Sequence, residues 1–225
     1  MRILAFDTAT EACSVALLHN GEVIDRTELA PRRHAELVLP MAEELLAEAG
    51  ITRKQLDAIA VGRGPGAFTG VRLAISVAQG IALALDIPVV PVSSLAALAM
   101  QAPRNGAAIL AVIDARREEV YAGEFRFDDA GLVEAIDAEC VLPASHLALR
   151  PVAAWNVIGT GWASYGDAIR ERLPSPPRWV DGRRYPQARE VVRLAAPLFS
   201  AGKGVSPEQA LPIYLRDKVA LTLEE

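Results

Sequence analysis

Two stretches of the chain carry the same pattern without a gap, and this internal repeat limits the choice of fold more than any other feature. Residues 3–17 align with residues 110–124, which places Asp7 on Asp114, 107 positions further along. In each copy an apolar strand ends in an aspartate, and a polar turn and a second strand follow, leading to a glycine-containing turn. Self-similarity of this kind predicts a duplicated structural unit. The alternative is a chance match between two common hairpins.

The elements around the first copy follow the order of an α/β unit. The expected strands are residues 2–7, 13–18, 22–28, 56–61 and 88–92. The expected helices are residues 33–49 and 71–85, where apolar residues recur at helical spacing. The dipeptide Asn20-Gly21 predicts a hairpin turn, and Pro40 should kink the first helix or mark its first turn. The strand, helix, strand order over residues 56–92 implies a right-handed parallel crossover.

A polar break at Pro103, Arg104 and Asn105 divides the chain. It predicts an N-terminal half over residues 1–103 and a shortened C-terminal half over residues 104–225. The second half has weaker signals, which predict helices at residues 164–171 and 187–201 and a loop at residues 173–179.

Two such units facing one another predict an α/β protein with the actin-like ATPase fold, built from two duplicated RNase H-like halves. This fold class includes hexokinase and the chaperone ATPases. In it, the aspartate-bearing hairpin turns face the cleft between the halves. Asp7 and Asp114 should therefore lie on opposite sides of a cleft.

The composition narrows the environment and the binding partners. The formal net charge is −5, whereas a protein that grips nucleic acid by itself usually has a basic surplus. Cys13 and Cys140 belong to no disulfide or zinc pattern and are expected to be buried, and the three histidines have no partner at metal-ligand spacing. The N-terminus does not resemble a signal peptide, and no apolar stretch is expected to span a membrane. These features predict a cytoplasmic protein without a metal.

Asp7 begins a candidate phosphate cleft. It lies at a strand end with Thr8 and Thr10, where a carboxylate could hold a magnesium-bound phosphate and the hydroxyls could donate to its oxygens. The alternative is that these three residues only cap a β-turn.

The glycine-rich loop over residues 62–70 is the sharper signal. The backbone amides of Gly64, Gly66 and Thr69 could face an anion ahead of a helix, and glycine also lets a ligand or a neighbouring chain approach the backbone. A Walker A loop is excluded because Thr69-Gly70-Val71 stands where Gly-Lys-Ser/Thr is required. A dinucleotide fingerprint is disfavoured, because Pro65 stiffens the loop and the next acidic residue precedes the following strand.

The helix after this loop is apolar on nearly every side. Its polar residues Arg72, Ser76 and Gln79 form one stripe, with Gly80 beside them. Such a helix is usually covered twice, once by its own sheet and once by another element. A core helix within the chain is one explanation, and the small Ser76 and Gly80 favour the other, a subunit interface.

Several segments together resemble the TsaB family from end to end. They are MRILAFDTATEACSVAL, RRHAELVLPMAEELL, VGRGPGAFTGVRLAISVAQGIA, IPVVPVSSLAALA, DARREEVYAG and LPIYLRDKVA. The match over residues 143–209 is loose. The related catalytic protein TsaD has a similar glycine loop and then a metal-binding histidine pair, where this chain reads PVSSLA (residues 91–96) without histidine.

The resemblance implies a non-catalytic subunit of a tRNA-modifying complex. That complex transfers threonylcarbamoyl to the adenosine next to the anticodon in tRNAs that read codons beginning with A. The subunit would bind TsaD as a heterodimer, with TsaE joining them, and would reach tRNA only through the complex. No intrinsic activity, cofactor or metal is expected, and nucleotide would bind only in the complex with TsaD and TsaE.

The resemblance also implies where the partner binds. The helices at residues 33–49 and 71–85 would pack against matching TsaD helices as a four-helix bundle, and the protein alone would form a homodimer through the same surface. The residues expected at or near this interface are His34, Leu37, Val38, Met41, Leu45, Arg72, Ser76 and Gln79.

A small ATP-dependent kinase of the same fold is the main alternative. In it, Asp7 and its threonines would hold phosphate, and residues 159–161 would contact adenosine. The short second half and the lack of an identifiable catalytic base disfavour it. A metallopeptidase lacks ligands, and a plain tRNA-binding module is disfavoured by charge. The basic pairs Arg53-Lys54, Arg116-Arg117 and Arg183-Arg184 are expected to be solvated surface, with contact to tRNA as the alternative.

Overall fold

The first half of the molecule is a mixed five-stranded sheet in the order β3-β2-β1-β4-β5. The computed structural model describes residues 1–216. The strands are β1 (Arg2–Asp7), β2 (Ala12–His19), β3 (Glu22–Leu29), β4 (Ala58–Gly62) and β5 (Val89–Val92). Strands β1, β2 and β3 pair antiparallel through hairpins, and β4 and β5 then add in parallel beside β1. The predicted turn between β2 and β3 is confirmed, since Asn20 and Gly21 both have positive φ.

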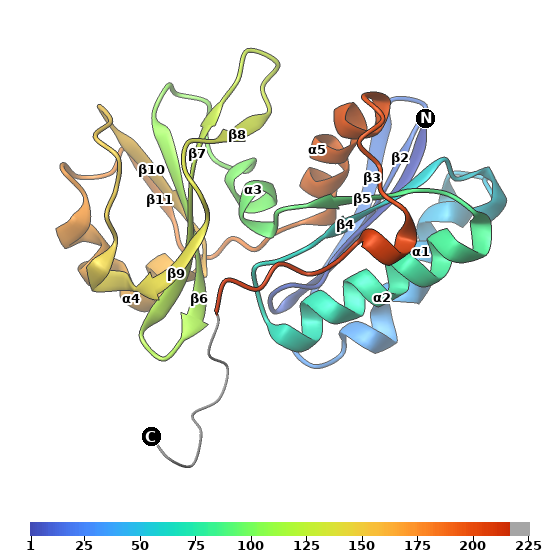
Figure 1. Cartoon of the computed structure of the whole chain (residues 1–225), viewed down its shortest axis with the longest axis horizontal. Coiled ribbons are helices and arrows are strands. Elements are labelled where there is room, and N and C mark those ends of the chain that lie inside the picture. The colour runs from blue at the N-terminus through green and yellow to red at the C-terminus, as the bar shows by residue number, and fades with distance from the viewer. Residues whose placement is uncertain (217–225) are drawn as a thin grey trace.

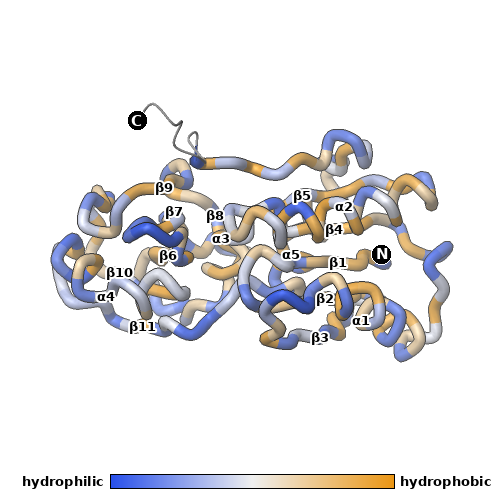
Figure 2. Tube along the Cα trace, turned by 90° about the horizontal axis from the view of Figure 1, so that it is seen from below, coloured by the Kyte–Doolittle hydropathy of each residue, from blue (hydrophilic) through white to orange (hydrophobic). Residues whose placement is uncertain are grey.

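Two long helices cover the outer face of this sheet. They are α1 (His34–Glu48) and α2 (Phe68–Leu85). The short helix η1 (Arg53–Gln55) links α1 to β4, and α2 follows β4. Their buried residues meet the large side chains of the central strands, including Phe6 and Leu17. Pro40 lies inside α1. Figure 2 shows that β1 and β5 are mainly apolar, whereas the outer turns are hydrophilic.

The second half repeats this arrangement in a shortened form. Its sheet has the order β11-β10-β6-β7-β8, with β9 also pairing with β7. The elements are β6 (Ala108–Arg116), β7 (Glu119–Phe127), β8 (Val133–Ala135), β9 (Cys140–Pro143), η2 (Ala144–His146), β10 (Trp155–Ile158), α4 (Thr160–Arg172) and β11 (Trp179–Asp181). Strand β6 corresponds to β1, and the β10-α4-β11 crossover corresponds to β4-α2-β5. The predicted duplication is thereby confirmed, and η2 stands where the first half has the long α1.

Two helices cross between the halves. Helix α3 (Ser94–Ala99) follows β5 but packs on β6 and β7 of the second sheet, whereas α5 (Ala188–Ser200) follows β11 but packs on the first sheet. Figure 1 shows both helices lying between the two sheets. The short helix η3 (Pro207–Gln209) then packs on α2. The halves are therefore tied together by an exchange of helices as well as by the chain.

The sequence signals for the second half were incomplete. The helix expected at residues 164–171 begins earlier, at Thr160, because Gly159 and Gly161 allow it to start against β6. Helix α3 was not predicted at all, since SLAALA is too short to show a helical period. The final stretch of the resemblance, residues 211–220, lies partly outside the described residues.

Helix α2 departs from one expectation. By length and composition alone it is apolar enough to cross a membrane, with a mean hydropathy of 1.6 over 18 residues. Arg72, Ser76 and Gln79 are too few to lower that mean. Core helices of globular proteins satisfy the same criterion, and α2 packs one side against β4. Only 28% of its residues are buried, so much of its surface is left for another contact.

Candidate functional site

The turn after β1 is closed around Asp7. Its carboxylate is fully buried, with Oδ1 accepting a hydrogen bond from the Ala9 amide at 2.9 Å and Oδ2 accepting one from the Ser94 hydroxyl at 2.8 Å. Burial raises the pKa of Asp7 from 3.8 to about 6, while the two hydrogen bonds act in the opposite direction. A Cβ atom on Gly62 would lie 2.0 Å from Oδ2, so the neighbouring strand needs glycine at that position.

The glycine-rich loop packs directly on this turn. The Thr8 hydroxyl donates to the Gly70 carbonyl at 2.6 Å, and a Cβ atom on Gly70 would lie 2.0 Å from the Thr8 carbonyl oxygen. A Cβ atom on Gly66 would lie 2.3 Å from the Ala9 carbonyl oxygen. Of the two roles open to these glycines, the geometry supports close approach of the protein's own backbone.

The other residues of the predicted phosphate cleft have mixed surroundings. Gly64 is buried and has positive φ, whereas Thr69 is exposed in the first turn of α2. Thr10 lines the cleft between the halves and is only 7% exposed, and its Oγ1 has no hydrogen-bond partner among the described residues. The structure thus gathers Asp7, Thr8 and the loop into one closed cluster, with Thr10 at the edge of the cleft.

The matching turn after β6, which carries Asp114, differs in its hydrogen bonds and in its exposure. The Asp114 carboxylate accepts hydrogen bonds from the Arg116 amide at 2.7 Å, the Ser164 hydroxyl at 3.0 Å and the Tyr165 hydroxyl at 3.2 Å. The turn residues Arg116 and Arg117 are exposed and have φ of 64° and 56°. Left-handed backbone is rare for non-glycine residues and costs about 1–2 kcal/mol each. The turn therefore holds two strained arginines outward.

A cleft of about 820 Å³ separates the two turns. Its lining carries more basic than acidic side chains. The charged residues of the lining are Glu11, Arg32, Asp114, Arg116, Arg117, Arg183 and Arg216. Arg116 spans the cleft to Glu11 at 3.1 Å. Within residues 1–216, Arg32, Arg117 and Arg183 form no ion pair.

A C-terminal segment, residues 210–216, passes from α2 to the second half (Figure 1). The Ala210 carbonyl accepts from Gln79 at 3.2 Å, and the Tyr214 hydroxyl accepts from Arg72 at 2.7 Å. Further along, Arg216 donates to the Ala115 carbonyl at 3.0 Å and pairs with Glu119. The polar stripe of α2 is therefore partly used by the chain itself.

The predicted partner-interface residues separate into three groups. Val38, Met41 and Leu45 are buried and pack toward the first sheet, so they belong to the core beneath α1 and cannot form the contact surface. Leu37 and His34 are half-buried, and His34 Nε2 lies 2.9 Å from the Thr10 carbonyl oxygen. The remaining three are the α2 stripe of Arg72, Ser76 and Gln79, in which the Ser76 side chain is exposed.

The outer surface of α1 and α2 is apolar at several exposed points. Leu39 on α1 is 47% exposed and Leu83 on α2 is 65% exposed. A groove of about 300 Å³ lies along the two helices. Its lining is Leu4, Leu39, Pro40, Ala42, Glu43, Leu46, Arg53 and Ile81. The spacing of apolar residues in the sequence located the helices, but it pointed to the buried face instead of this one.

The segment proposed to contact adenosine in a kinase has a packing role here. A Cβ atom on Gly159 would lie 2.2 Å from the Val112 carbonyl oxygen, and one on Gly161 would lie 2.9 Å from the Val112 Cβ. Within residues 1–216, no group of three histidine, cysteine or acidic side chains could hold a metal ion. Cys13 and Cys140 are both free, Cys13 buried and Cys140 half-buried.

The sequence did not identify the arginines of the cleft as a group. Three of them, Arg116, Arg117 and Arg183, belong to basic pairs that were expected to be solvated surface, whereas Arg32 is adjacent to Arg33 and Arg216 lies in the C-terminal segment. The only available signal was that each follows or precedes a turn close to a strand end. These turns are far apart in the sequence, so the sequence did not show that three of them meet at one cleft.

Known proteins resemble the chain along almost its whole length. The family model described as "TsaD: tRNA N6-adenosine threonylcarbamoyltransferase" matches residues 25–168. The tRNA threonylcarbamoyladenosine biosynthesis protein TsaB of Escherichia coli (strain K12) is 43% identical over 98% of this chain and 96% of its own length. The TsaB protein of Haemophilus influenzae is 39% identical over 97% and 95%. The solved structure of YeaZ from Pseudomonas aeruginosa has a TM-score of 0.88 and 47% identity, covering 95% of this chain and 99% of that one.

Proposed function

The chain belongs to the TsaB family, which takes part in tRNA threonylcarbamoyladenosine biosynthesis, and we propose that it acts there as a non-catalytic subunit. It supports a catalytic partner, TsaD, in transferring threonylcarbamoyl to the adenosine next to the anticodon. The observation that carries the non-catalytic role is the closed turn at Asp7. A carboxylate that is fully buried and already held by two donors is not open to a metal-bound nucleotide.

The same observation weighs against the kinase alternative. A kinase of this fold would need Asp7 and its threonines to face the phosphates, yet Thr8 donates to Gly70 and the glycine loop fills the space in front of them. Asp114 in the other half is also occupied by donors from its own chain. Both aspartates therefore accept hydrogen bonds from donors of the chain itself.

We assign the partner surface to the outer side of α1 and α2. Its exposed Leu39 and Leu83, the groove between the helices and the small Ser76 and Gly80 suit another helix pair. TsaD covers this surface in the heterodimer, and a second copy of the chain covers it when TsaD is absent. TsaE joins the pair. The protein acts in the cytoplasm.

A reconstituted transfer assay tests the role. TsaD, TsaE, tRNA and the enzyme that makes the adenylate are combined with and without this chain, and the chain alone is tested for ATP hydrolysis. We expect transfer to depend on the chain and the chain alone to be inert. Transfer that proceeds equally well without it, or ATP turnover by the chain alone, contradicts the proposal.

A serine pair tests the surface. Ser76→Arg places a large cation on the exposed side of α2 and should weaken TsaD binding at least tenfold without changing the unfolding temperature. Ser200→Arg is the matched control, because Ser200 is exposed on α5, which packs on the other face of the sheet. Titration calorimetry measures both. Equal affinities for the two variants contradict the assigned surface.

A further inference from the structure

The cleft between the halves has a charge opposite to that of the whole chain. The chain carries a formal net charge of −5, whereas five arginines and two acidic residues line this cleft among the described residues. Arg32, Arg117 and Arg183 form no ion pair within residues 1–216, and all three are exposed. A cleft lined by one sign of charge concentrates the positive field and attracts anions to it.

Three helices begin at this cleft. The first residues of α1, α2 and α4, which are His34, Phe68 and Thr160, all belong to its lining. None of these helices has a side-chain hydrogen bond at its N-cap. Helix N-termini carry partial positive charge and favour anions, so they add to the field of the arginines.

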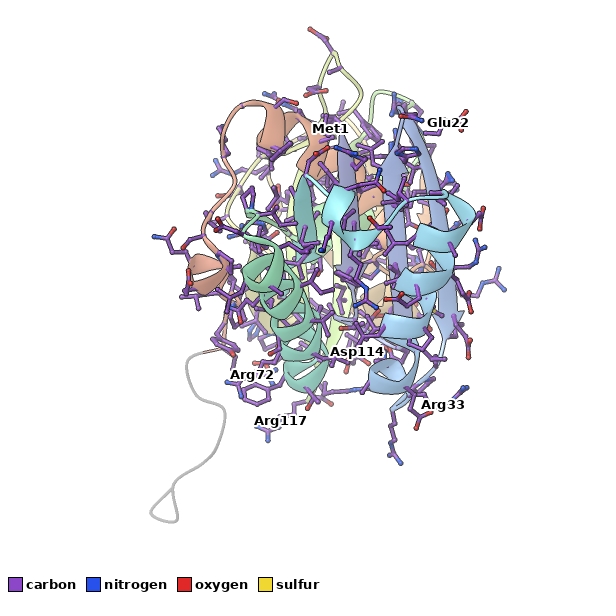
Figure 3. All side chains as sticks on the ribbon, turned by 90° about the vertical axis from the view of Figure 1, so that its right-hand side faces the viewer. Met1, Glu22, Arg33, Arg72, Asp114 and Arg117 are labelled. Carbon is purple, nitrogen blue, oxygen red and sulfur yellow. The ribbon has the colours of Figure 1, made fainter. Side chains whose placement is uncertain are left out.

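The arginines are held outward at a cost. Arg32, Arg116 and Arg117 have φ of 69°, 64° and 56°. Such backbone is unfavourable for arginine and persists when the surrounding structure imposes it. The three come from two separate turns, one ahead of α1 and one between β6 and β7. Figure 3 shows Arg117 at the same end of the molecule as Arg33 and Arg72.

Aromatic rings lie beside the charge. Phe68 and Tyr214 line the cleft, each 49% exposed, with their ring centres 6.0 Å apart. The Arg72 guanidinium lies 3.4 Å from the centre of the Phe68 ring. Exposed rings and guanidinium planes next to a basic groove are the surfaces on which single-stranded bases stack.

We propose that this cleft binds the sugar-phosphate backbone of an RNA strand. A single nucleotide fits less well, because the inner turn at Asp7 is closed and the unpaired arginines stand on three separate segments at the rim. Successive phosphates of an extended strand can reach all three. The inference rests on the proposed function, since tRNA is the substrate of the modification, and it gives the chain its own contact with that substrate.

Binding of a labelled tRNA transcript, followed by fluorescence anisotropy, tests the site. The variant carries Arg32→Glu, Arg117→Glu and Arg183→Glu, and the control carries Lys54→Glu, Arg126→Glu and Lys203→Glu, which change the net charge equally outside the cleft. We expect the cleft variant to lose at least tenfold in affinity and the control less than threefold. For a single strand, log affinity falls with log salt by roughly 0.7 per phosphate contact, so the slope should decrease by about 2 for three lost contacts.

Further measurements separate the explanations. Circular dichroism and the unfolding temperature establish that each variant folds, and a triple glutamine version repeats the test with neutral side chains. The proposal is overturned if the two charge-reversed proteins bind tRNA with equal affinity. It is also overturned if the cleft variant loses ATP binding but keeps tRNA binding. The experiment uses the full chain alone and then with TsaD. If tRNA binding follows the cleft but the transfer assay does not need the chain, the proposed function fails and this site stands.

Discussion

The turns after β1 and β6 hold the same place in the two sheets and are completed in opposite ways. After Asp7 the chain continues with small residues, and the loop carrying Gly66 and Gly70 packs onto them until the carboxylate is fully buried. After Asp114 the chain continues with Ala115 and two arginines, and the corresponding glycines, Gly159 and Gly161, pack lower on the strand at Val112. Because Gly159 and Gly161 contact β6 at Val112 and do not contact the turn itself, the second turn projects into the cleft.

The difference separates a structural turn from a binding turn on one scaffold. The first turn contributes close packing and gives up access to solvent. The second keeps strained, charged residues at the surface, a pattern typical of sites that bind a ligand. Duplicated halves can thus divide stability and binding between them, and each property can be changed by itself.

The largest expected effect comes from reopening the closed turn. Gly70→Ala places a Cβ atom 2.0 Å from the Thr8 carbonyl oxygen, so backbone must move, and we expect a loss of about 3 kcal/mol or more in the free energy of unfolding. Gly80→Ala in the same helix is the control, because nothing lies within 4 Å of its added Cβ atom. It should stabilise by about 0.5–1 kcal/mol. Urea unfolding measures both, and similar values for the two would mean that the turn is not tightly closed.

The second effect concerns the buried carboxylate and depends on pH. The pKa of Asp7 is about 6 in the folded protein against 3.8 for an unperturbed aspartate, so the folded state holds the proton more tightly. Its contribution to stability is therefore present below pH 4 and is lost as the pH rises to about 6. Asp7→Asn does not titrate. Its stability relative to the unchanged protein should rise by about 2.5 kcal/mol between pH 4 and pH 7.

Urea unfolding across that pH range measures the difference between the two proteins. The loss of one hydrogen-bond acceptor in Asp7→Asn affects every pH equally and does not alter the slope. A difference that stays constant from pH 4 to pH 7 would show that Asp7 is not buried as an ionisable group.

The sequence predicted the closed half better than the open one. The apolar periods of the first half located its strands and both long helices within a few residues, because each element buries a continuous face. The duplication of Asp7 at Asp114 also followed from the sequence. The burial of Asp7 did not, since it depends on Ser94 and Gly62, which reach it only after the sheet has formed. The meeting of Arg32, Arg117 and Arg183 is likewise a product of the tertiary structure.

A third effect tests the strain in the open turn. Arg117 has φ of 56°, which glycine adopts without cost, so Arg117→Gly should stabilise the protein by about 1 kcal/mol. The same change should weaken tRNA binding, because it removes an unpaired guanidinium from the cleft. Arg126→Gly in β7 is the control, and there glycine should destabilise. If Arg117→Gly also destabilises, the arginine contributes to folding and the division between the two turns is wrong.

The smallest effect on stability is expected where the two turns touch. Arg116 reaches Glu11 across the cleft at 3.1 Å, but the two side chains are 74% and 40% exposed. Exposed ion pairs contribute little, so Glu11→Gln should change the free energy of unfolding by less than about 0.5 kcal/mol. The same substitution removes one of the two acidic groups from the lining and releases Arg116 toward the ligand. Affinity for tRNA should then rise several-fold at low salt, with the gain shrinking as salt screens the charges. Glu43→Gln on the outer side of α1 removes the same charge outside the cleft and should leave tRNA affinity unchanged, so equal gains in the two variants would assign the effect to net charge alone.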